Sequence, residues 1–160
     1  MSKAAGTKAK DVAPAPPAVY NAFLKDLDLA GVRMTEGTFA SRVARPPVTK
    51  SRVNIDFGAD YNNAKGGFEA TAAFTFTFLA TETEEPLGTI RAVYSLRYRT
   101  AQPMTDDVWA VFSMRNLRLN AWPYAREFAQ AATLRMDWPK FTLPVVNSAR
   151  FGATKAKNDA

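Results

Sequence analysis

The chain has 160 residues, of which 47% are hydrophobic, and this is enough for one domain with an apolar core. It contains neither cysteine nor histidine, which excludes disulfides, thiolate nucleophiles, histidine general bases and the usual zinc sites. We therefore expect a protein that is not an enzyme and that uses no metal or cofactor.

The two ends of the chain carry much of the formal net charge of +6. They are rich in alanine and lysine, and such segments bury too little apolar surface to fold. We expect a disordered N-terminal tail over residues 1–18, a single domain over 19–151 and a disordered C-terminal tail over 152–160. No apolar run approaches the roughly 18 residues of a membrane span, and no secretory signal is visible, which favours a cytoplasmic protein.

Two segments in the first part of the chain are predicted to be strands. Apolar residues alternate with polar ones over residues 23–29 and again over 53–57, the spacing of side chains on one face of a strand. Between the two segments, Pro46 and Pro47 disfavour a helix and indicate an extended crossing.

The clearest periodicity runs from Phe68 to Ala80, where aromatic and small apolar residues occupy every second position. After a polar connection at 82–88, a second alternating run covers residues 90–98, with arginine and serine on its polar side. The two runs predict an antiparallel hairpin with one apolar face, which helices must cover.

The last third of the chain predicts helices, so the expected fold class is α+β. Asp106 and Asp107 suit the positive N-terminal end of a short helix. A longer helix is expected to begin near Pro123, because proline favours the first helical position, and to end near Arg135. The apolar stripe expected to cover the sheet consists of Tyr124, Phe128, Ala131, Ala132 and Leu134.

Three short blocks in the same region resemble a known family. Residues 121–128 read AWPYAREF, residues 138–143 read WPKFTL and residues 146–147 read VN. Together they are similar to the signature of SecB-type export chaperones, in which an aromatic-Pro-Tyr-Ala-Arg-Glu helix start leads to a Phe-Pro-x-Leu-x-Leu segment and a Pro-Val-Asn ending. The resemblance covers about residues 20–149, and the Pro-Tyr-Ala-Arg-Glu block is its most specific part.

The resemblance implies a four-stranded antiparallel sheet packed on one face by C-terminal helices, assembled as a homotetramer that is a dimer of dimers. It implies a molecular chaperone, a holdase that binds unfolded polypeptides and keeps preproteins competent for export through the SecA translocation ATPase. Other members protect the antitoxin of a toxin–antitoxin pair, and this alternative stays open. The residues that match or flank the family's peptide groove are Val53, Ile55, Phe57, Trp122 and Phe141, for which ordinary core packing is the other interpretation.

Family members that hand clients to SecA present carboxylates on the outer sheet face. Asp26 matches one of these positions, whereas Arg91 stands at another, so both are expected on the partner-docking face. Arg97 and Arg99 follow on the same expected face, and like charges would oppose the cationic tail of SecA. The basic face favours a dedicated or atypical role.

A rival interpretation is a non-specific nucleic-acid-binding module. Its candidate contacts are Arg52, Arg91, Arg97, Arg99 and the lysine-rich ends. Proteins that bind single strands place aromatic rings beside their cations, whereas here the strand aromatics alternate with the arginines and so face the other side. The chaperone interpretation is therefore favoured, and an interaction with phosphates alone stays open.

Overall fold

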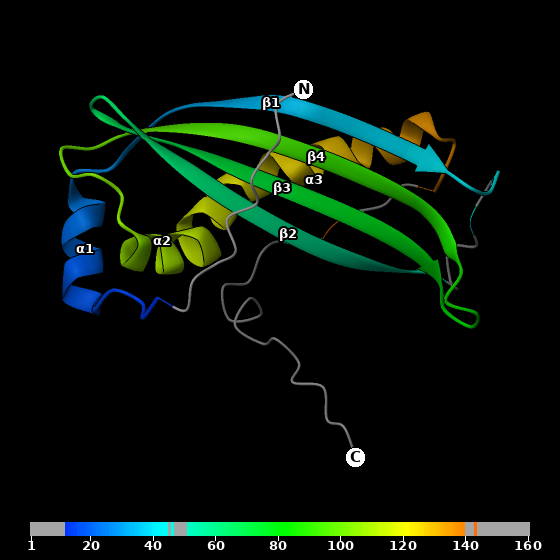
Figure 1. The fold of residues 1–160 in the computed structure, drawn as a ribbon. Coiled ribbons are helices and arrows are strands. Elements are labelled where there is room, and N and C mark those ends of the chain that lie inside the picture. Colours follow the sequence, from blue (N-terminus) through cyan, green and yellow to red (C-terminus); the bar gives the residue numbers. More distant parts are fainter. Residues whose placement is uncertain (1–11, 45, 47–50, 140–142, 144–160) are drawn as a thin grey trace, which may run out of the picture.

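The computed structural model describes residues 12–44, 46, 51–139 and 143. They form a four-stranded antiparallel sheet with helices against one of its faces, as expected for an α+β protein (Figure 1). In chain order the elements are helix α1 (Pro17–Lys25), strands β1 (Asp28–Ser41), β2 (Ser51–Ala64), β3 (Gly67–Ala80) and β4 (Pro86–Arg99), helix α2 (Asp106–Phe112), a π-helical turn (Ser113–Leu117) and helix α3 (Arg118–Arg135).

The strands lie in the order β1-β4-β3-β2, so β1 and β2 are the two edges of the sheet. The predicted hairpin is present as β3 and β4, and β2 extends it on one side while β1 returns to pair with β4 on the other. One row of paired residues crosses all four strands on the face toward the helices, and it consists of Phe39, Ile90, Phe76 and Ile55.

The core lies between the sheet and α3, which crosses one face of the sheet (Figure 1). Every second residue of β3 from Phe68 to Phe78 is buried. In β4 every second residue from Ile90 to Tyr98 is likewise buried, and Val93 and Ser95 on the other face are buried as well. The side of α3 that meets these rings carries small residues, so the helix can approach the sheet closely. Its buried alanines are Ala121, Ala125, Ala129 and Ala132.

The first predicted strand is wrong for residues 23–27, because Phe23 belongs to helix α1. Pro17 stands at the first helical position, and Tyr20 and Phe23 are buried on one side of the helix. Leu24 and Leu27 complete a spacing of three and four residues, which is helical. The apolar residues in 23–29 fit the spacing of a strand as well as that of a helix. Pro17, which favours the first position of a helix, is the signal that indicates the helix.

The expected disordered tail over residues 1–18 is also too long. Ala15 is buried, and its N–H donates a hydrogen bond of 3.0 Å to the carbonyl of Asp107, so the fold begins before α1. Residues 1–11 and the C-terminal tail expected over 152–160 lie outside the described residues, as does the end of the domain expected at 151.

The long helix does not begin at Pro123, which lies inside α3. The chain is helical without a break from Asp106 to Arg135, and the π-helical turn joins α2 to α3. A π turn takes in an extra residue and so shifts the helix face. Of the stripe expected on α3, Tyr124 and Leu134 are exposed, whereas Ala132 is buried together with the other alanines of the helix.

Candidate peptide-binding surface

Val53, Ile55 and Phe57 lie together on edge strand β2, and we call them the β2 strip. Their partners across the sheet are Phe78, Phe76 and Phe74, so the β2 strip points toward the helix side of the sheet. Helix α3 lies over β1, β3 and β4, which leaves the side chains of β2 less covered than those of the inner strands.

The exposure of the β2 strip matches that position. Ile55 is 39% exposed, and Val53 and Phe57 are half-buried. The Phe57 ring packs against Phe74 with 5.0 Å between the ring centroids. The guanidinium carbon of Arg118 lies 4.5 Å from the centroid of the Phe57 ring. Burial lowers the pKa of Arg118, whose cation borders the strip.

Trp122 was expected to line this surface, but it lies underneath the surface instead. Its side chain is only 6% exposed, and its ring centroid lies 5.8 Å from that of Phe74 and 6.3 Å from that of Phe76. Trp122 therefore supports the β3 residues that pack against the strip. Phe141, the fifth predicted contact, lies outside the described residues.

The outer edge of β2 adds main-chain groups to the surface. Within the described residues β2 pairs only with β3, so N–H and C=O groups along its other side have no strand partner there. Such an edge is a template for an added strand. A row of partly exposed apolar side chains next to a free edge is the arrangement that binds an extended apolar peptide.

A second apolar strip lies on β1, and the sequence patterns did not reveal it. Leu29, Met34 and Phe39, here called the β1 strip, are each between 38% and 41% exposed. They pair with Tyr98, Tyr94 and Ile90 and so point to the helix side. Two register shifts, between Leu29 and Gly31 and between Met34 and Glu36, break the alternation that would have predicted this strand.

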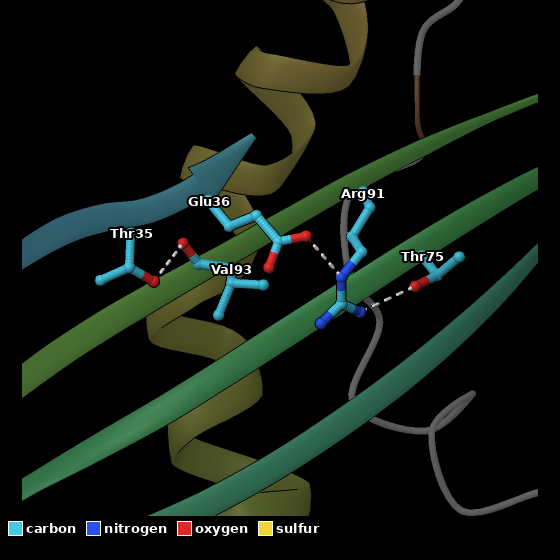
Figure 2. A network of polar contacts seen from close by, with 5 residues as sticks. All are labelled: Thr35, Glu36, Thr75, Arg91 and Val93. Carbon is cyan, nitrogen blue, oxygen red and sulfur yellow. Dashed lines mark hydrogen bonds and ion pairs between the residues drawn. The ribbon is translucent and has the colours of Figure 1, made fainter. Parts of the chain in front are cut away.

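Asp26 and Arg91 are not brought together as a docking face. Asp26 ends helix α1 and lies outside the sheet. Arg91 projects from the side of β4 away from the helices, where its Nε donates to Glu36 at 2.9 Å and its Nη1 to Thr75 at 3.4 Å (Figure 2). Asp28, two residues after Asp26, is the strand partner of Arg99. Arg99 lies eight positions along β4 from Arg91, a distance of about 26 Å at 3.3 Å per residue, so Asp26 is not close to Arg91.

The outer face of the sheet is less basic than its arginines suggested. Arg91, Arg52 and Arg99 pair with Glu36, Glu84 and Asp28 at 2.9, 2.5 and 3.9 Å. These pairs are exposed and partly neutralise the face. Among the described strand residues, the aromatic rings of β2, β3 and β4 are on the opposite face, so a nucleic-acid base would find no ring to stack on beside the arginines.

Catalytic and metal-binding groups are scarce in the described chain. No three of its Asp and Glu residues are placed to hold a metal ion. Burial raises the pKa of Tyr20 and of Tyr98 to about 12, so both phenols keep their protons at neutral pH. None of the helices in this part of the chain combines the length and the apolar character that crossing a membrane requires.

No family model and no curated protein matches the sequence. Among solved structures, the fold is similar to that of the SecB-like chaperone of Mycobacterium tuberculosis in complex with a peptide from the HigA1 antitoxin, with a TM-score of 0.70 and 15% identity over 81% of this chain and 97% of that one. A protein of unknown function from Streptococcus agalactiae matches with a TM-score of 0.40 and 12% identity over 74% of this chain and 97% of its own. The first of these similarities shows that the chain has a SecB-like fold.

Proposed function

We propose that the protein is a molecular chaperone of the holdase type, which binds unfolded polypeptide segments on the β2 strip without nucleotide or cofactor. The observation that carries the proposal is the row of partly exposed apolar side chains beside the free edge of β2. A bound segment would add a strand at that edge through main-chain hydrogen bonds, with every second side chain packed on Val53, Ile55 and Phe57.

The SecB-like neighbour supports a peptide client, because that protein was solved with an antitoxin peptide. We propose that the client of the present chain is likewise a dedicated, partly folded partner such as an antitoxin, in the cytoplasm. Export of preproteins through SecA is the second candidate. A pull-down with purified SecA separates the two, since only the export role needs that contact.

We further propose that the chain works as a homotetramer built as a dimer of dimers. The β1 strip supports self-association, because its apolar side chains lie beside the other edge of the sheet, where β1 pairs with no further strand among the described residues. Sedimentation equilibrium of the whole chain measures this directly, and a monomer at all concentrations would rule the tetramer out.

Aggregation of a chemically unfolded enzyme tests the holdase role. An equimolar amount of the protein is expected to suppress light scattering without nucleotide. Ile55→Asp places a charge in the β2 strip and is expected to weaken suppression about tenfold, since burying a charge against an apolar client is costly. Asn54→Asp is the matched control, because the same charge then points to the outer face.

Site-specific labelling gives a second readout that does not depend on suppression. The chain contains no cysteine, so Ile55→Cys and Asn54→Cys each introduce one attachment point for an environment-sensitive dye. The dye at position 55 is expected to shift when a client is added, while the dye at 54 stays unchanged. No suppression across several clients, or equal shifts at both positions, would contradict the proposal.

A further inference from the structure

The outer face of the sheet contains a hollow of about 350 Å³ between β1 and β4. It lies on the face opposite to the β2 strip, next to the register shift between Leu29 and Gly31. The residues that line the hollow are Gly31, Val32, Arg33, Glu69, Ser95 and Arg97.

The absence of a side chain at Gly31 shapes one wall of the hollow. Gly31 is the pairing partner of Arg97, and a Cβ built on this glycine would lie 3.3 Å from Nη2 and 3.8 Å from Nε of Arg97. The guanidinium therefore rests over the glycine and extends toward β1. Arg33 lies two positions further along β1, opposite Ser95, so the two arginine side chains are diagonal neighbours on one face.

These two arginines differ from the other three on the outer face. Arg52, Arg91 and Arg99 have carboxylate partners within 4.0 Å. Arg33 and Arg97 have no such partner among the residues that the structure describes. Glu69 pairs with Arg97 in the strand register, yet its carboxylate accepts a hydrogen bond from the Ser95 hydroxyl instead.

We propose that Arg33 and Arg97 bind a carboxylate of an acidic peptide segment that docks on the outer face of the sheet. Guanidinium groups bind planar oxyanions through paired N–H donors. The two arginines and Glu69 together give the hollow a net charge of +1, which suits one carboxylate better than a phosphate dianion. Ser95, almost fully buried, forms the floor beneath them.

A peptide also fits the surroundings of the hollow better than a small acid does. Beyond the hollow, the outer side of β3 carries three half-buried threonines, with Ala73 between the first and the second, and their hydroxyls can donate hydrogen bonds to a peptide main chain. These threonines are Thr71, Thr75 and Thr77. The site is on the other face from the proposed client surface, so this partner is distinct from the client.

Fluorescence anisotropy with a labelled peptide of alternating Glu and Ser tests the proposal on the full chain at low salt. Changing both Arg33 and Arg97 to Gln is expected to weaken binding about tenfold or more. The matched control changes Arg52 and Arg91 to Gln, which removes the same charge from the same face, and less than about a twofold effect is expected because both are already paired.

The variant Gly31→Val tests the position of the Arg97 guanidinium without changing the net charge, because the added side chain displaces that group. It is expected to weaken peptide binding about fivefold. Ile55→Asp should bind the peptide as the wild type does. Equal losses in the two double variants, or equal binding of a peptide with Gln in place of Glu, would overturn the proposal. So would displacement by inorganic phosphate or free glutamate at concentrations below that of the peptide.

Discussion

The indole N–H of Trp138 donates a hydrogen bond of 3.0 Å to the hydroxyl of Ser41, which joins the segment after α3 to the end of β1. The same ring meets Phe78 of β3 edge-on, with 5.3 Å between the centroids. It lies over Gly88 of β4, where a Cβ would come within 2.5 Å of the ring. The buried side chain of Trp138 thus contacts the end of β1, the end of β3 and the beginning of β4.

Replacing Trp138 with Ala should therefore lower the free energy of unfolding by about 3–5 kcal/mol, because a large buried ring leaves a cavity. Ser41→Ala removes only the hydrogen bond and should cost about 1 kcal/mol. Urea denaturation monitored by circular dichroism measures both values. Equal costs for the two variants would show that the ring contributes little packing.

Two glycines in neighbouring strands should respond in opposite ways to Ala. At Gly67 a Cβ would lie 1.9 Å from the carbonyl oxygen of Tyr98, so Gly67→Ala must push β3 away from β4 and should cost about 3 kcal/mol. At Gly58 the nearest atom is 4.0 Å away, so Gly58→Ala should change stability by no more than about 1 kcal/mol, toward stabilisation. The comparison of their urea midpoints is the test, and a tolerant position 67 would contradict the pairing of these strands.

The ion pair between Arg91 and Glu36 should add little to stability. Both side chains are more than 40% exposed, and exposed pairs contribute about 0.5 kcal/mol. Glu36→Gln should thus leave the unfolding midpoint almost unchanged at physiological salt. A loss above about 2 kcal/mol would mean that the network in Figure 2 holds β1 to β4.

The buried tyrosines predict a loss of stability in alkali. Burial raises the pKa of Tyr20 and Tyr98 from 10.0 to about 12 in the folded state, so the unfolded chain releases these protons first. The contribution is fully present below pH 10 and is lost as the pH rises from 10 toward 12. Urea midpoints across this window should fall, and less steeply in Tyr98→Phe. A midpoint that stays constant would contradict the burial of these phenols.

The inner part of the fold could be predicted because an apolar residue stands at every second position from Phe68 to Phe78 in β3 and from Ile90 to Tyr98 in β4, and these residues are all buried on one face. The edge strand β1 could not, since its two register shifts move side chains between faces. The predicted helix start at Pro123 was wrong for a different reason. A proline is tolerated inside α3 because the rest of the continuous helix is stabilised by its packing on the sheet.

The candidate sites were predictable to different degrees. The sequence predicts one shared face for Val53, Ile55 and Phe57, because they alternate with polar residues. Their partial exposure could not be predicted, because it depends on where α3 lies on the sheet. The proximity of Arg33 to Arg97 could not be predicted from the sequence, because the two residues are far apart in the chain and are diagonal neighbours only through the pairing of β1 with β4. Only the sheet order brings them to one hollow.

The place of β1 in the sheet also bears on how the chain folds. Strands β2, β3 and β4 meet their neighbours through short turns, whereas β1 must find β4 across roughly 50 to 70 residues of intervening chain. Closing so large a loop is slow, and we expect the three-strand meander to form first, with the first strand added last. Until that step the edge of β4 stays open to pairing with other chains, which makes the nascent protein itself prone to the aggregation that holdases prevent.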